Sequence, residues 1–238
     1  MTTITKLLAA SAFALTMGVS SAQAAIFIST DGVTDLFANV AVDGFGDFMQ
    51  SFSALTDAQR GGFESITVDG NTGIAPVVLG SRSVEFNAAG GPANPGITLY
   101  VTQTDLTLAQ AAFFNSSFSF NARKQWSGNA RAFVSATNQK YGGVAAGPLV
   151  NFAANSCTFS TCAQSADVGS GLIDVSGGLY SVTHYYQVSS NDQVGRGEID
   201  ALTSAMAVPE PGTWALMIGG FAGAGAMLRR RRSLAAAA

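Results

Sequence analysis

The sequence contains a single histidine, His184, and this scarcity narrows the catalytic possibilities. A Ser-His-Asp triad would have to use His184 as its base, yet this residue lies between aromatic neighbours on a predicted strand. We therefore expect His184 to pack in the core. The sequence also lacks a G-x-S-x-G elbow, a Walker loop and an H-E-x-x-H zinc motif. We assign no catalytic residues and expect a protein that is not an enzyme.

Charged residues are also few, at 11% of the chain. Between residues 25 and 208, fourteen acidic residues stand against seven basic ones, a net charge of −7. This balance excludes a basic surface for nucleic acid. Low charge with abundant glycine, serine, threonine, asparagine and alanine is typical of an exported, β-rich domain with many turns.

The only two cysteines, Cys157 and Cys162, lie five positions apart. In an oxidising compartment we expect them to form one local disulfide, which would stabilise the fold by about 2 kcal/mol on a loop-closure model. The shorter C-x-x-C spacing of redox pairs is absent. A metal site would need further ligands, so we predict no metal and no cofactor.

The first 24 residues have the pattern of a secretory signal peptide. Lys6 supplies the positive charge, an apolar stretch follows over residues 7–19, and Ala22-Gln23-Ala24 forms an A-x-A cleavage site. We therefore expect export and cleavage by a signal peptidase, and a mature chain that begins at Ala25 or Ile26.

The body, residues 25–207, is long enough for one domain with a substantial core. Short apolar-polar alternations bounded by glycine-rich turns predict a mainly β fold, a single β-sandwich that is jelly-roll-like. The predicted strands cover residues 25–29, 64–68, 77–79, 83–87, 96–104, 117–121, 131–135, 150–153, 172–175, 180–188 and 197–206.

Two local predictions concern how these segments connect. We expect strands 180–188 and 197–206 to pair as a β-hairpin at the end of the body. Residues 106–114 carry good helix formers after Asp105, a possible N-cap, and predict a helix. Residues 56–60 favour one or two helical turns, and residues 34–50 are a weaker helical candidate because of Gly44 and Gly46.

Aromatic and acidic residues leave two binding hypotheses open. Sugars stack on flat aromatic rings, and the candidate contacts are Trp126, Tyr141 and Tyr185, with Tyr180 and Tyr186 as further aromatic surfaces. Core packing is the competing interpretation for each ring. The oxygen-rich turns 43–47 and 69–71 suit Ca²⁺, but plain turns are favoured. A hydrolase with paired carboxylates would need two acidic residues facing each other across a cleft.

The C-terminal tail combines three features in a fixed order. Val208-Pro209-Glu210-Pro211 predicts a stiff, extended peptide, because each proline lacks an N–H donor and restricts the residue before it. An apolar run over residues 213–228 begins near Trp214 and predicts a transmembrane helix. Its uncharged part spans roughly 22 Å, which is short for a hydrocarbon core of about 30 Å. Arg229, Arg230, Arg231 and Arg232 follow, and positive-inside orientation leaves residues 233–238 cytoplasmic.

This tail closely resembles the PEP-CTERM sorting signal of Gram-negative bacteria, on the residues just named. The resemblance is limited to residues 208–232. It implies recognition and cleavage by an exosortase, transient anchoring in the inner membrane, and then release to the cell surface or the extracellular space. It further implies an association with exopolysaccharide or biofilm. We expect a secreted surface or matrix protein without catalysis, and alternatively a carbohydrate-binding module or a carboxylate hydrolase.

Overall fold

A computed structural model describes residues 25–72, 77–88, 94–108, 110–123, 125–141, 150–154, 161–191, 195–207 and 211–235. The predicted signal peptide, with Ala22 and Ala24, lies outside these residues. So does Cys157, and the placement of the Cys162 side chain is likewise not described, so the disulfide stays a prediction.

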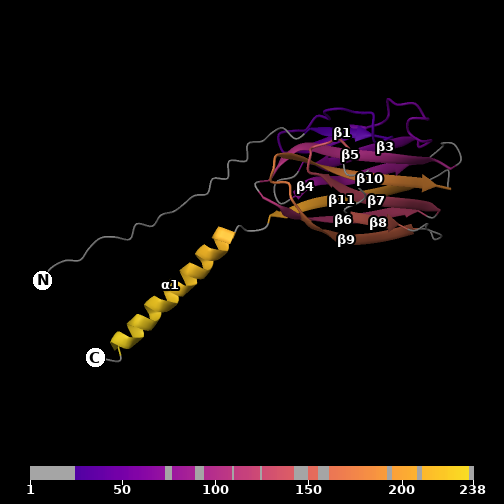
Figure 1. Ribbon diagram of the computed structural model, residues 1–238. Coiled ribbons are helices and arrows are strands. Elements are labelled where there is room, and N and C mark those ends of the chain that lie inside the picture. The colour runs from indigo at the N-terminus through magenta and orange to yellow at the C-terminus, as the bar shows by residue number, and fades with distance from the viewer. Residues whose placement is uncertain are drawn as a thin grey trace.

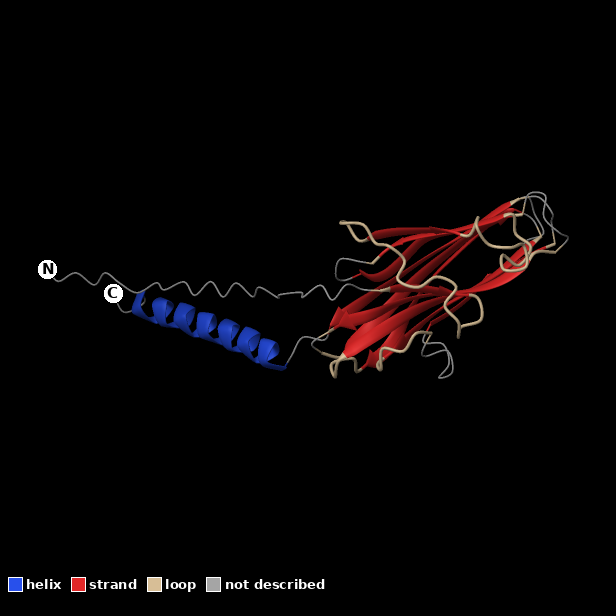
Figure 2. Cartoon of the chain, turned by 90° about the horizontal axis from the view of Figure 1, so that it is seen from above, coloured by secondary structure: helices blue, strands red, loops and turns tan. Residues whose placement is uncertain are grey.

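The body consists of two antiparallel sheets packed face to face, as Figures 1 and 2 show. Sheet A contains, in spatial order, β1 (Ile26–Ser29), β5 (Gly96–Thr107), β10 (Leu179–Ser190), β7 (Trp126–Ser135) and β8 (Val150–Ala154). Sheet B contains β2 (Asp47–Ser51), β3 (Ser65–Asn71), β4 (Val77–Asn87), β11 (Arg196–Ala207), β6 (Ala112–Arg123) and β9 (Thr161–Ile173). The predicted β-sandwich is confirmed.

The strand order is that of a jelly roll. From β4 onward the strands pair as nested hairpins, β4 with β11, β5 with β10, β6 with β9 and β7 with β8. The chain therefore behaves as one long hairpin wrapped around the core. Pairing of β11 with β6 and of β10 with β7 completes the two sheets, and β1, β2 and β3 extend them at one edge.

The core forms from the inward positions of both sheets, where strand periodicity places every second side chain. Trp126 is its largest fully buried residue and packs 5.6 Å from Phe63, ring centre to ring centre. Gly197 passes so close that a Cβ at this position would lie 2.6 Å from the Trp126 ring. The indole of β7 in sheet A thus fills space that Gly197 leaves open on β11 of the facing sheet B.

His184 is fully buried between the sheets, so the prediction that it packs in the core is confirmed. Its Nε2 lies 2.7 Å from the hydroxyl of Thr203, and this hydroxyl lies 2.7 Å from that of Ser116. The two hydrogen bonds link β10 of sheet A to β11 and β6 of sheet B. Burial lowers the pKa of His184 to about 3, so the imidazole is neutral at physiological pH.

The predicted hairpin of the last two strands is wrong. β10 belongs to sheet A and β11 to sheet B, so the connection crosses the sandwich instead of joining neighbours. The predicted pairing relied on short-range turn signals, whereas each of the two strands finds its partners far away in sequence. The short distance in sequence between two strands therefore does not show that they pair with each other.

The predicted helix over residues 106–114 is also wrong. β5 continues to Thr107 and β6 begins at Ala112, with Phe114 buried 5.8 Å from the Tyr180 ring. Burial of this side chain between the sheets outweighs helix propensity. Residues 34–46 form bends and turns before β2, and residues 57–62 form turns.

The C-terminal segment forms α1 (Pro211–Ala235), which projects away from the sandwich in Figures 1 and 2. The predicted C-terminal helix is confirmed, but its membrane-spanning role is not. Within the described ranges, no helix is both long enough and apolar enough to cross a membrane. Glycine and alanine make up half of residues 213–228, and Arg229 ends this run.

Candidate functional site

The sorting tail begins where the last strand ends. β11 finishes at Ala207, and Val208, Pro209 and Glu210 lie outside the described residues. Pro211 opens α1, a position that suits proline because the first helical N–H needs no partner. Trp214 is half exposed and Arg229 is exposed, whereas the side chains of Arg230, Arg231 and Arg232 are not described. The motif thus joins the sandwich directly, without an intervening domain.

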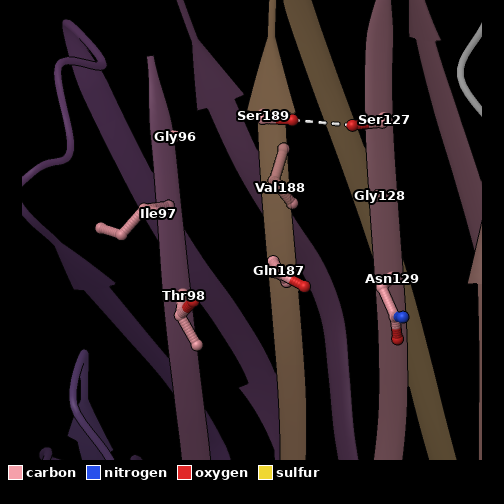
Figure 3. A pocket seen from close by; sticks show the side chains of 9 residues that line it. All are labelled: Gly96, Ile97, Thr98, Ser127, Gly128, Asn129, Gln187, Val188 and Ser189. Atoms are coloured by element: carbon pink, nitrogen blue, oxygen red, sulfur yellow. Dashed lines mark hydrogen bonds between the residues drawn. The ribbon is translucent and has the colours of Figure 1, made fainter.

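A second candidate lies on the outer face of sheet A, where polar side chains form rows across three strands. Thr98 of β5, Gln187 of β10 and Asn129 of β7 are direct neighbours in the strand register. They form one row of the lining of a shallow depression with a volume of about 530 Å³, and Figure 3 shows them side by side on the three strands. Its lining consists of Gly96, Ile97, Thr98, Ser127, Gly128, Asn129, Gln187, Val188 and Ser189.

The depression is neutral and rich in hydrogen-bonding groups. Amides from Gln187 and Asn129 provide both donors and acceptors, and hydroxyls from Ser127 and Ser189 lie 2.7 Å apart. Gly128 faces inward, since a Cβ there would lie 3.0 Å from the Phe120 ring. The site therefore suits an uncharged ligand with many hydroxyl groups better than an ion.

Aromatic rings flank the depression in the next row of the same face. Tyr100, Tyr185 and Arg131 are register neighbours on β5, β10 and β7. The Tyr100 and Tyr185 rings meet edge to face at 5.2 Å, and the Arg131 guanidinium lies 5.5 Å from the Tyr185 ring centre. Both tyrosines are partly exposed, and they lie two positions along their strands from Thr98 and Gln187.

Tyr141 anchors the neighbouring loop. Its hydroxyl donates a 2.9 Å hydrogen bond to Asp35, whose other oxygen lies 2.5 Å from the Lys140 ammonium. Burial, followed by the Asp35 carboxylate, raises the pKa of the Tyr141 phenol. Because this ring is buried and its hydroxyl is bonded within the protein, Tyr141 contributes to packing of the face.

The residues predicted to contact a sugar therefore differ in their exposure. Trp126 is fully buried in the core, so its prediction as an exposed stacking surface is wrong. Tyr180 and Tyr186 are buried as well. Among the predicted contacts, Tyr185 is partly exposed on the face that carries the depression, two positions from Gln187. The amide pair of Gln187 and Asn129 was missed, although the alternation of strand 180–188 already placed Gln187 on the same face as Tyr185.

The two oxygen-rich turns do come together, around a second hollow of about 520 Å³ lined in part by Asp43, Asp47 and Asp69. Asp43 accepts backbone N–H bonds from Phe45 and Asp47 at 2.8 and 2.9 Å. Asp47 accepts a 2.6 Å bond from the Asn71 amide. Among the described residues, no group of three potential metal ligands is placed to hold an ion. These bonds are those of turn-forming residues.

The outer face of sheet B carries carboxylates. Partial burial raises the pKa of Asp200, and the nearby charges of Glu198 and Asp69 act in the same direction. The Ser119 hydroxyl donates a 2.8 Å bond to Asp200, which opposes this rise. Hydrolysis by paired carboxylates needs two acidic residues on opposite walls of a cleft. Glu198 and Asp200 line neither of the two hollows described above.

Comparison with known proteins bears mainly on the tail. The family model of the PEP-CTERM protein-sorting motif matches residues 207–232. The tail thus carries a PEP-CTERM motif, the substrate signal of exosortase, and implies an exported protein that is processed at the membrane. No curated protein matches the sequence.

Several solved structures share limited similarity with the body. The K3 cleaved adhesin domain of Lys-gingipain from Porphyromonas gingivalis W83 is 13% identical, with a TM-score of 0.33, over 53% of this chain and 74% of that one. TmCBM61 in complex with beta-1,4-galactotriose is 11% identical, with a TM-score of 0.30, over 71% and 87%. At these scores, neither structure bears on the ligand or the role of this chain.

Proposed function

We propose that this chain is an exported protein of the cell surface or extracellular matrix of a Gram-negative bacterium, sorted through its PEP-CTERM tail and associated with exopolysaccharide. The body, residues 25–207, is a non-catalytic domain, and residues 208–232 are the segment that an exosortase recognises. Residues 1–24 direct export and are removed by a signal peptidase. The observation that carries this proposal is the match to the sorting motif directly after the last strand.

The test replaces Pro209-Glu210-Pro211 with three alanines and follows the chain by cell fractionation and mass. We expect the variant to accumulate unprocessed with the membrane, because the prolines and the glutamate of the recognition motif are lost. A matched control replaces Ser176, Gly177 and Gly178 with alanine in an exposed turn where the added methyl groups at both glycines meet open space. Unchanged processing and location of the first variant would refute the proposal.

A second candidate function, carbohydrate binding by the body, is favoured by the depression on sheet A. A saccharide presents hydroxyls that donate and accept, which matches the side-chain amides of Gln187 and Asn129. The partly exposed Tyr185 ring beside them offers apolar surface to the C–H groups of a sugar. The ligand proposed for this site is a neutral stretch of exopolysaccharide.

Binding to a glycan array and to exopolysaccharide purified from the producing cells tests this role. Replacing both Gln187 and Asn129 with alanine removes two amides, and we expect affinity to fall roughly tenfold or more. The matched control replaces Gln50 and Asn121, the same residue types on strands of sheet B. Absence of binding by the native chain, or equal losses in both variants, would exclude this function for the depression.

A further inference from the structure

Four large apolar side chains are exposed at the end of the sandwich where the chain leaves for the tail. Met206 is 58% exposed, Leu172 56%, Phe113 43% and Leu179 43%. We call these four residues the apolar end. Single exposed apolar residues are ordinary on a protein surface, but a contiguous group marks a contact surface.

Three of the four side chains form one row across sheet B. Met206 of β11 pairs with Phe113 of β6, and Phe113 pairs with Leu172 of β9. Directly paired residues in an antiparallel sheet have Cβ atoms about 5 Å apart, so the three side chains are neighbours. Their chain neighbours Ala205 and Phe114 are buried on the opposite face, as strand alternation requires.

The fourth side chain lies at the same extremity but on the outer face of sheet A, because its neighbour Tyr180 points into the core. Leu179 begins β10 in sheet A, directly after the turn that follows β9. The inter-sheet contact of Phe114 with Tyr180 lies beside it, at 5.8 Å between ring centres. The apolar end thus has three side chains on the outer face of sheet B and one on sheet A, at the extremity of the sandwich from which β11 exits.

The short connection to the tail decides which partner this surface meets. Five residue steps separate Met206 from Pro211, the first residue of α1. At about 3.5 Å for each step, the connection spans at most roughly 17 Å. Because the PEP-CTERM motif is processed at the membrane, the apolar end lies within this distance of the tail held there.

We infer that the apolar end is a membrane-contact surface, and that it lies on the lipid headgroup region while the tail is still attached. Partitioning of four apolar side chains into that region would orient the sandwich and hold the residues before α1 close to the bilayer. This inference rests on the proposed sorting role, which brings the tail to the membrane. The carbohydrate depression does not enter it.

Binding of the full chain to vesicles of phosphatidylethanolamine and phosphatidylglycerol tests the inference. One variant carries Phe113→Ser, Leu172→Ser and Met206→Ser, and a matched variant carries Val33→Ser, Phe45→Ser and Met49→Ser, three exposed apolar residues elsewhere. Both keep the same tail. We expect vesicle affinity to fall roughly tenfold or more in the first variant and to change less than about twofold in the second. Equal affinities would overturn the inference.

A single substitution provides a readout that does not depend on the stability of the triple variant. Tryptophan is placed at Leu172 or, as a control, at Val33, in a Trp214→Phe background, and brominated lipid is added as a quencher. We expect quenching of the probe at position 172 and none at position 33. No quenching at 172, or concentration-dependent dimerisation that the triple variant abolishes, would assign the surface to another partner and overturn the inference.

The result of the vesicle experiment can be distinguished from the result of the sorting experiment. The vesicles contain neither exosortase nor glycan, so they report only on lipid contact. Failure of the sorting role appears as unchanged processing of the Pro209-Glu210-Pro211 variant in cells. Failure of the membrane-contact inference appears as unchanged vesicle affinity, with processing of that variant still blocked.

Discussion

The two tryptophans of this chain lie in opposite surroundings. Trp126 is fully buried in the body, in contact with Phe63 and against the backbone of Gly197. Trp214 lies on α1 and is 51% exposed, and other large apolar side chains of the same helix are exposed as well. The same residue type thus serves packing in one region and a linear recognition motif in the other.

This difference follows from how each region forms its backbone hydrogen bonds. In the body, partners such as Met206 and Phe113 are more than ninety positions apart in the sequence, so the sheets exist only when the whole domain folds. In the tail, α1 bonds within each turn and needs no distant partner. We therefore expect substitutions in the body to alter stability and substitutions in the tail to alter sorting.

The largest expected contrast comes from truncating each tryptophan. Trp126→Ala should destabilise the body by about 3–5 kcal/mol, because it removes the largest core side chain and leaves a cavity. Trp214→Ala should change the free energy of unfolding by less than about 0.5 kcal/mol. Denaturant unfolding of both variants measures the two changes in the free energy of unfolding. Similar losses would show that the tail packs on the body and would remove the contrast.

Glycine to alanine substitutions compare the body with the tail through effects of intermediate size on stability and helicity. Gly197→Ala places a Cβ 2.6 Å from the Trp126 ring, and we expect a loss of about 1–3 kcal/mol from overpacking. At Gly220 in α1 the added methyl group meets open space, and helicity should rise because alanine is favoured by about 1 kcal/mol. Thermal unfolding measures the first effect and far-ultraviolet circular dichroism the second. A neutral Gly197→Ala would contradict the tight packing around Trp126.

A smaller contrast concerns pH. The pKa of His184 is lowered to about 3 by burial, against about 6.5 in the unfolded chain. Between these values the unfolded chain binds a proton that the folded one does not, so the stabilisation is complete above pH 6.5 and is lost as pH falls. From pH 6.5 to 5.5 the free energy of unfolding falls by about 1 kcal/mol, and the loss approaches about 1.4 kcal/mol for the next pH unit.

The control for this prediction is His184→Gln, which replaces the imidazole near Thr203 with an amide that does not titrate. Its stability should lack the component that begins near pH 6.5. Residues 208–232 contain no histidine, so the helical signal of α1 should stay constant over the same range. An equal pH dependence in the native chain and the variant would show that another group is responsible.

Much of the fold was predictable because the body has many short alternating strands. The β-sandwich, the jelly-roll arrangement and the burial of His184 followed from periodicity and composition. The pairing of β10 with β11 and the helix after Asp105 were wrong for one reason. Both used local turn and capping signals, whereas the segment around Phe114 and the two final strands are placed by contacts far along the chain.

The candidate site on sheet A was predictable only in part. Tyr185 was identified as an aromatic contact, and strand alternation placed Gln187 on its face. Asn129 could not be joined to them, because β7 and β10 are about sixty residues apart and their register depends on the complete sheet. Trp126 was misplaced since its flanking Ser, Gly and Asn residues resemble a loop, while the indole points inward.

The sequence by itself determined the sorting tail, since a linear motif is recognised through its order of prolines, glutamate, apolar residues and arginines. Tertiary structure alone decided which polar side chains line the depression and which apolar residues form the apolar end. Both surfaces combine strands that are distant in the chain. Their side chains lie on the outer faces because of the strand register, and a shift of one residue would turn them toward the core.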